Sequence, residues 1–251
     1  MKRTWALAIL LGLASGLAQG RLEAGAYGAP GTLFPTLEAA LTLEGDEAFF
    51  RLQGGRGALG LASGVALGPL GYLGYGFQVE LGEGGMGGVV FAEGGAGPFA
   101  LQGRLGYRPR RAPPLFPEEG PFGRLSLRYR LAPREAVGLL LEGGEAARVE
   151  ATYARRAGAT YTLGAGLAGP PYLVLGYRGE VGEGMDVLDL ALRLGGLNRL
   201  EAGLYLGEAS LLLTLSYPFA GSLLLWLGDL GLEVGHREAP YAWVRYAWRW
   251  P

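Results

Sequence analysis

Residues 209–228 read ASLLLTLSYPFAGSLLLWLG, a run of 20 residues without a charged side chain. A run of this length is sufficient for a transmembrane helix. Pro218 and Gly221 lie near its centre, however, where they disfavour a continuous helix. Ahead of the proline, apolar and hydroxyl-bearing residues alternate, with Leu211, Leu213, Leu215 and Tyr217 set against Ser210, Thr214 and Ser216. The segment therefore predicts two β-strands joined at YPFAG, and a single membrane helix is the alternative.

The same alternation recurs along most of the chain. Residues 122–131 (FGRLSLRYRL), 160–167 (TYTLGAGL) and 173–181 (LVLGYRGEV) each place apolar side chains on one face and mainly small or polar ones on the other. We count about eleven such segments after residue 121 and six or seven before residue 107. Gly or Pro interrupts them about every ten to twelve residues, the spacing of strand-and-turn proteins. The pattern predicts an all-β chain of roughly 14–18 antiparallel strands with short turns.

The composition narrows the class of protein further. The chain has 251 residues, 47 of them Gly, with no Cys, one His and a formal net charge of −1. Without Cys there is no disulfide framework, and a net charge near zero gives no electrostatic footprint for nucleic acid. The near-exclusive use of Arg over Lys and the scarcity of Asn, Gln and Cys are typical of a thermophile.

The amino-terminal segment has the features of a secretory signal peptide. Lys2 and Arg3 precede the apolar stretch WALAILLGLA, and small residues for cleavage follow near Ala18 or Gly20. We therefore predict a signal peptide over residues 1–20 and a single domain over residues 21–251. An uncleaved amino-terminal anchor is the alternative.

One connection differs from the short turns elsewhere. Residues 108–121 read RPRRAPPLFPEEGP and contain five prolines, so this segment cannot be a central strand. It is either a surface loop or a loop that folds inward and narrows a pore. The surface loop is the simpler interpretation.

Two properties indicate that the apolar faces point outward. A barrel of about 16 strands encloses a space too wide for one layer of Leu and Val to fill. Each apolar face carries about four positions, which cover roughly 20–25 Å, close to the apolar band of an outer membrane. Two stacked sheets with an apolar interior would be the soluble alternative. These properties favour an up-and-down transmembrane β-barrel with its polar face inside.

The carboxyl terminus, YAWVRYAWRWP over residues 241–251, supplies a third argument. Tyr246, Trp248 and Trp250 follow Val244 at alternate positions, as suits a strand in lipid that ends at the headgroups. This pattern resembles the carboxyl-terminal assembly signal of bacterial outer-membrane β-barrel proteins of the porin type. That family usually ends on the aromatic residue itself, whereas here Pro251 follows it. The resemblance implies an outer-membrane location, with membrane lipid and the outer-membrane assembly machinery as partners.

No pattern in the sequence predicts an enzyme, a metal site or a cofactor. His236 is the only imidazole, and there is no G-x-S-x-G motif to accompany it. A zinc site would have only carboxylates to add to that one His. Residues 82–87, GEGGMG, match G-x-G-x-x-G, but a strand follows where a phosphate site requires a helix, so we interpret them as a turn.

The charged residues of the polar faces are the candidate pore lining. The set consists of Arg124, Arg128, Glu150, Arg178, Glu180, Arg199, Glu201 and Arg245. Several alternate in sign two residues apart, as in Arg148 with Glu150, Arg178 with Glu180 and Arg199 with Glu201, and on an inner face such charges are expected to form cross-strand ion pairs. Frequent glycines on the same face are expected to leave room inside, among them Gly74, Gly76, Gly164, Gly166 and Gly176.

Three functions fit these features. The leading prediction is a passive outer-membrane pore for small polar solutes, whose charged wall sorts what passes. A closed structural or anchoring barrel, in which the same charges form a salt-bridge lattice, is the second. A soluble exported β-protein that carries an apolar ligand is the third.

Overall fold

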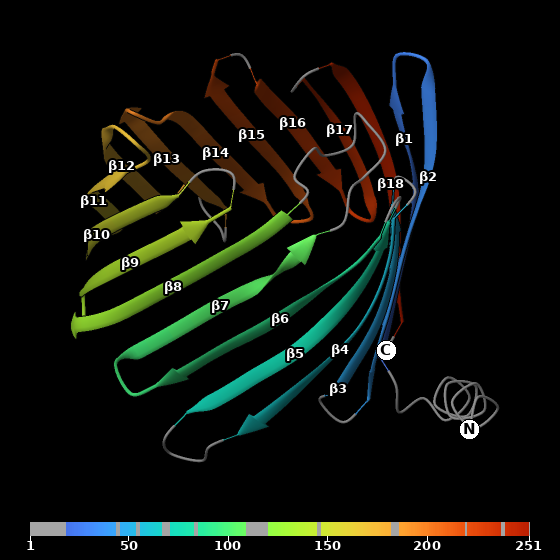
Figure 1. The fold of residues 1–251 in the computed structure, drawn as a ribbon. Coiled ribbons are helices and arrows are strands. Elements are labelled where there is room, and N and C mark those ends of the chain that lie inside the picture. The colour runs from blue at the N-terminus through green and yellow to red at the C-terminus, as the bar shows by residue number, and fades with distance from the viewer. Residues whose placement is uncertain are drawn as a thin grey trace.

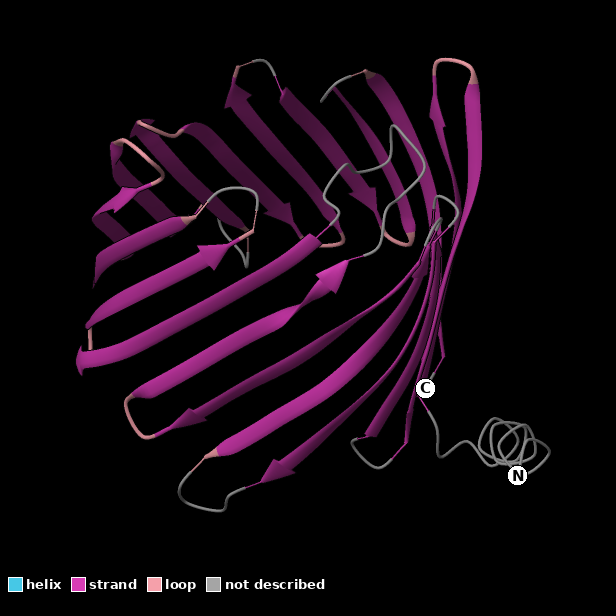
Figure 2. Cartoon of the chain, viewed as in Figure 1, coloured by secondary structure: helices cyan, strands magenta, loops and turns pink. Residues whose placement is uncertain are grey.

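The structure, a computed structural model, is built from β-strands (Figure 2). It describes residues 19–43, 46–53, 56–66, 71–82, 85–108, 120–144, 147–181, 186–218, 220–236 and 239–250. The first nine strands are β1 (Gln19–Ala29), β2 (Thr32–Leu43), β3 (Asp46–Gln53), β4 (Arg56–Ala66), β5 (Tyr72–Gly82), β6 (Gly85–Ala96), β7 (Phe99–Arg108), β8 (Gly120–Ala132) and β9 (Glu135–Gly143). The other nine are β10 (Arg148–Ala157), β11 (Ala159–Leu167), β12 (Pro171–Glu180), β13 (Val187–Gly195), β14 (Asn198–Leu206), β15 (Ala209–Tyr217), β16 (Ala220–Leu227), β17 (Leu230–His236) and β18 (Pro240–Trp250).

These 18 strands form one antiparallel sheet in chain order. Each strand pairs with the strands before and after it along the chain, in the arrangement of Figure 1. β1 also pairs with β18, from Gly20 opposite Trp250 to Gly28 opposite Ala242, so every strand has a neighbour on both sides. The predicted all-β, up-and-down fold is confirmed, with a strand number at the upper limit of the expected range.

The uncharged segment 209–228 forms a hairpin. Its two halves are β15 and β16, which pair from Ala209 opposite Leu227 to Ser216 opposite Ala220. Pro218 lies between the two strands, where its missing N–H and fixed φ do not disturb the ladder. Within the described residues, no helix has the length and apolar character needed to cross a membrane.

The up-and-down order gives the barrel two distinct ends. We call the end where β1 begins and β18 finishes the terminal end, and the opposite end the far end. Two-residue turns close several hairpins at the terminal end, and Gly207 and Gly228 open two of them with φ near +57°. Glycine adopts such a conformation without the steric conflict of a Cβ, which explains these short connections. The connection between β7 and β8 lies at the far end.

Exposure divides each strand into two faces. On β12, Leu173 is 57% exposed, whereas its neighbours Tyr172 and Val174 are each 3% exposed. On β18, Val244, Tyr246 and Trp248 are exposed, whereas Ala247 is fully buried. Side chains diverge on the convex side of a closed sheet and converge on its concave side, so the exposed apolar residues lie on the outer face. The polar residues between them lie on the inner face.

Three sequence predictions fall outside the described residues. They are the signal peptide, of which residues 1–18 are not described, the proline-rich connection at residues 109–119, and the side chain of Trp250. Gly120 and Pro121, which we had placed in that connection, form the start of β8. Proline is compatible with the first residues of a strand because little of the ladder depends on its nitrogen there.

Candidate functional site

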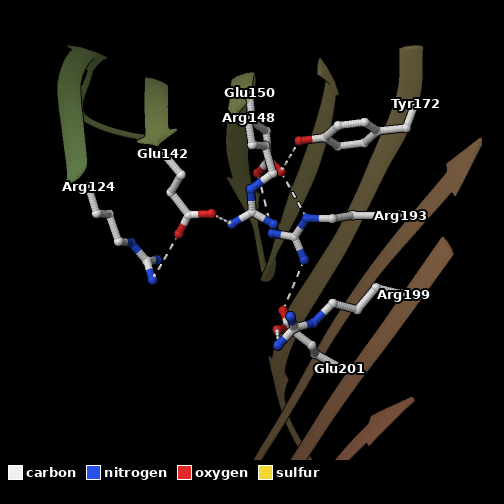
Figure 3. Close-up of polar contacts among 8 residues, drawn as sticks. All are labelled: Arg124, Glu142, Arg148, Glu150, Tyr172, Arg193, Arg199 and Glu201. Atoms are coloured by element: carbon white, nitrogen blue, oxygen red, sulfur yellow. Dashed lines mark hydrogen bonds and ion pairs between the residues drawn. The ribbon is translucent and has the colours of Figure 1, made fainter. Parts of the chain in front are cut away.

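The inner wall of strands β8 to β14 carries an extended charged network (Figure 3). At its centre Arg193 of β13 donates to Glu150 of β10 through Nε, 2.8 Å from Oε2, and through Nη2, 3.4 Å from Oε1. Its Nη1 donates to Glu201 of β14 at 2.9 Å. The hydroxyl of Tyr172 donates to Glu150 at 3.1 Å. The Arg193 and Glu150 side chains are 12% and 7% exposed, so the pair is shielded from water and strengthened by its surroundings.

A second carboxylate bridges two arginines beside this centre. Glu142 of β9 lies 2.5 Å from Arg148 on β10 and 3.4 Å from Arg124 on β8. The Arg124 side chain is 55% exposed, whereas that of Arg148 is 15% exposed. Arg124 therefore keeps most of its guanidinium available to solvent, whereas Arg148 belongs to the wall itself.

The structure shows the partners of these alternating charges. Arg178 lies 3.5 Å from Asp189, its directly opposite residue on β13. Glu150 contacts Arg193 of β13 across two intervening strands. Arg199 and Glu201 pair along one strand, at 2.7 Å.

Sequence patterns missed Arg193 and Tyr172 as members of this network. Arg193 and Glu150 are 43 residues apart, with two whole strands between them in the sheet. Only the inward curvature of the wall brings such side chains together. The alternation does place Arg193 on the inner face, but it does not give its partner.

Some inward glycines also have a packing role. Several of them accommodate an aromatic ring from the adjacent strand, so that a Cβ at Gly166 would overlap Tyr172 and one at Gly76 would overlap Phe91. These glycines are therefore packing positions and do not simply add free volume. The rings lie along the wall over them, and Tyr172 is thereby positioned to reach Glu150.

Arg245 belongs to a separate cluster where β18 meets β1. It contacts Glu233 of β17 at 2.9 Å and Glu23 of β1 at 3.7 Å, and its guanidinium lies 4.1 Å from the ring centre of Trp243. Tyr27 stacks on Tyr241 beside it, with ring centres 5.3 Å apart. The Arg245 side chain is only 14% exposed. Its charge is thus matched by two carboxylates at the closure of the sheet.

The two remaining candidates lie near the terminal end of the wall. Arg128 and Glu180 both line a recess at that end, together with Arg178. Unlike the paired residues above, Arg128 forms no salt bridge with another residue in the described ranges. Among the eight candidates, Arg128, Arg178 and Glu180 therefore lie at this recess, and the other five belong to the paired wall or the Arg245 cluster.

Aromatic residues form a row on the outer face near the terminal end. The row consists of Phe99, Tyr129, Tyr161 and Tyr177, on four of the six strands from β7 to β12. Phe99 and Tyr129 have ring centres 4.6 Å apart, and Tyr161 and Tyr177 5.6 Å apart. Tyr246 and Trp248 of β18, predicted as interface residues, lie on the same face near the same end, with ring centres 4.4 Å apart. Such a girdle is typical of the level where a membrane barrel meets lipid headgroups.

His236 and Gly82 lie on β17 and β5, outside the strands of the charged network. Across the ranges that the structure describes, no group of three or more His, Asp or Glu side chains could hold a metal ion. His236 ends β17 at the far end and, by the alternation with Glu233, belongs to the outer face. Gly82 and Gly85 are opposite each other at the β5–β6 hairpin, as expected for a turn.

Comparison with known proteins defines the class by fold. A triple mutant of the porin from Rhodopseudomonas blastica superposes with a TM-score of 0.52 at 8% identity, over 93% of this chain and 99% of that chain. A second mutant of the same porin gives a TM-score of 0.51 with the same identity and coverage. No protein-family model matches the sequence, and no curated protein matches it. The chain therefore has the fold of a porin-like outer-membrane β-barrel.

Proposed function

We propose that this protein is an outer-membrane pore that lets small polar solutes pass along its charged inner wall. The observation that carries the proposal is the closed ring of 18 strands with apolar residues outside and arginine, glutamate and glycine inside. Eighteen strands about 4.8 Å apart and tilted by about 40° make a ring roughly 36 Å across, backbone to backbone. A ring of this size is wider than its own inward side chains can fill.

The outer face supports insertion into a membrane. Leu163, at the middle of β11, is 60% exposed, and its cross-strand neighbours Tyr153 and Leu175 are exposed as well. Membrane lipid would cover this surface, which water would otherwise contact unfavourably. We propose export by the signal peptide at residues 1–20 and insertion by the outer-membrane assembly machinery, with Tyr246, Trp248 and Trp250 as the recognised strand. The terminal end, with its short turns, would then face the periplasm.

The other two functions are less well supported. A soluble carrier of an apolar ligand needs an apolar interior, whereas this interior contains the ion pairs around Glu150 and Glu142. A closed structural barrel remains the competing function for the paired part of the wall. The free guanidinium groups near the terminal end favour the pore, because an ion-pair lattice that serves only stability would match its charges.

Single-channel recording tests the proposal. The refolded protein is added to planar lipid bilayers, and insertion is verified independently by flotation with lipid vesicles. We expect discrete conductance steps and swelling of vesicles in isotonic small sugars. Protein that inserts stably but produces neither steps nor swelling is a closed barrel, and the proposed pore would be wrong. Protein that stays in the aqueous fraction without detergent would overturn membrane insertion itself.

A further inference from the structure

A recess of about 590 Å³ opens on the inner wall at the terminal end. Its charged lining comes from five strands or turns and consists of Arg128, Arg130, Arg134, Arg156, Arg178, Glu135 and Glu180. Five guanidinium groups thus face two carboxylates. This excess of positive charge distinguishes the recess from the network of Figure 3, where every carboxylate contacts at least one arginine.

Small residues create the recess between the arginines. Ala136 of β9 lies opposite Arg130 on one side and Ala154 on the other, and Ala136 is 6% exposed. Thr160 of β11 lies opposite both Arg156 and Arg178. Short side chains therefore form the floor, and long cationic ones rise from β8, β10 and β12. With strands about 4.8 Å apart, the outer arginines arise roughly 20 Å apart at the backbone and line the same recess.

The guanidinium groups of the recess are largely unmatched. Arg178 has Asp189 at 3.5 Å, and Glu135 has Arg155 at 4.0 Å, outside the recess lining. Arg128, Arg130, Arg134 and Arg156 form no salt bridge with another residue in the part of the chain that the structure describes. Like charges that line one recess repel each other, and salt weakens this repulsion. A bound anion would remove the repulsion.

The simplest alternative is that these arginines are solvated residues at a rim. A single arginine on a surface is hydrated by water and does not imply a ligand. Here, however, four guanidiniums without a salt bridge to a described residue line one recess, whose uncharged floor leaves space for a ligand. The planar guanidinium binds carboxylate and phosphate oxygens through two parallel hydrogen bonds, so several of them around one recess favour an oxyanion with more than one charge.

We propose that this recess binds small soluble solutes that carry multiple phosphate or carboxylate charges. This inference rests on the proposed pore function where it concerns transport of the anion. Binding of the anion to the recess does not require that the barrel conduct ions. The ligand is a dissolved solute and not a lipid headgroup, because Arg128, Arg130, Arg156 and Arg178 lie on the inner face, away from the acyl chains. An anion that enters the barrel would concentrate at the terminal end before it leaves.

Inorganic pyrophosphate is the test ligand. Its binding to the refolded protein is measured by titration calorimetry in maltoside micelles, which contain no phosphate group. We expect saturable binding that Arg130→Gln and Arg156→Gln each weaken roughly three- to fivefold and that R128Q/R130Q/R156Q weakens at least about tenfold. Affinity should fall as the salt concentration rises.

Arg249→Gln is the matched control. Arg249 is also exposed, lies at the terminal end on the inner face of β18, and forms no salt bridge with a described residue. Its replacement removes the same charge outside the recess, so we expect unchanged affinity. If R249Q weakens binding as much as R130Q, pyrophosphate is attracted by the overall charge of the protein, and the recess is not its binding site. The single variants keep the test intact if the triple variant fails to fold.

Failure of the pore and failure of the recess give different results. Pyrophosphate binding without conductance steps would retain the anion site and reject transport. Conductance without recess-dependent binding would retain the pore and overturn this inference. If both hold, pyrophosphate should reduce the single-channel current of the parent protein and of R249Q, but not that of the triple variant.

Discussion

Substitution of Leu163 by arginine tests the orientation of the two faces most directly. Leu163 lies at the centre of β11, on the outer face, and is 60% exposed. Arginine at the middle of a membrane barrel's lipid face destabilises it by about 2–4 kcal/mol. Loss of the contact between leucine and acyl chains adds about 1 kcal/mol. We therefore expect a loss of roughly 3–5 kcal/mol, which is at least about a hundredfold in the folding equilibrium.

The adjacent Thr162 provides the matched control. It lies on the inner face between Ala154 and Gly176, whose small side chains leave space for an arginine. If the inner face is hydrated, Thr162→Arg should change the free energy of unfolding by less than about 1 kcal/mol. Both variants are compared by denaturant unfolding in lipid vesicles, with folded protein followed by its heat-modifiable migration on gels.

The test of the membrane orientation is the difference between L163R and T162R in their loss of unfolding free energy. Equal losses in L163R and T162R would show that the two faces do not differ in environment. A loss below about 0.5 kcal/mol in L163R would mean that Leu163 contacts water, and the membrane orientation would be wrong.

Three further substitutions test the wall and the interface. Arg193→Met leaves Glu150 with Tyr172 alone, so we expect a loss of about 2–3 kcal/mol in denaturant unfolding, largely recovered when Glu150→Gln is added. Gly166→Ala should displace Tyr172 and destabilise the barrel by about 1–3 kcal/mol, whereas Gly143→Ala, with open space around its Cβ, should have little effect; equal effects would contradict the packing role. Trp248→Ala removes an exposed outer aromatic ring, and we expect slower insertion into vesicles than for Val244→Ala, measured by the same gel assay; identical insertion rates would argue against an interface role.

Local sequence patterns predicted the strands well, for reasons visible in particular elements. In β11, Tyr161, Leu163 and Leu167 alternate with Thr160 and Thr162, and the structure places the two sets on opposite faces. A side-chain period of two is a property of the extended backbone itself, so it can be read without knowledge of the partner strands. The same reasoning resolved residues 209–228 as a hairpin, because Pro218 cannot continue a helix.

The charged wall was predicted only in part. The alternation assigned Arg124, Glu150, Arg199 and Arg245 to one side of their strands, yet it did not give the partners of Arg178 and Glu150. The network around Arg193 joins β10, β13 and β14, and no spacing along the chain encodes that combination. The aromatic row from Phe99 to Tyr177 was likewise missed, although each member is an outward residue near a strand end.

The sequence by itself determined that this chain forms amphipathic strands, where they turn, and which side chains share a face. These properties depend on residues a few positions apart, and backbone geometry transmits them directly. Only the tertiary structure decided which charges meet and which remain unmatched. The partners of Arg193 and the recess around Arg130 arise when the closed sheet curves inward and fixes the register of strands that are tens of residues apart.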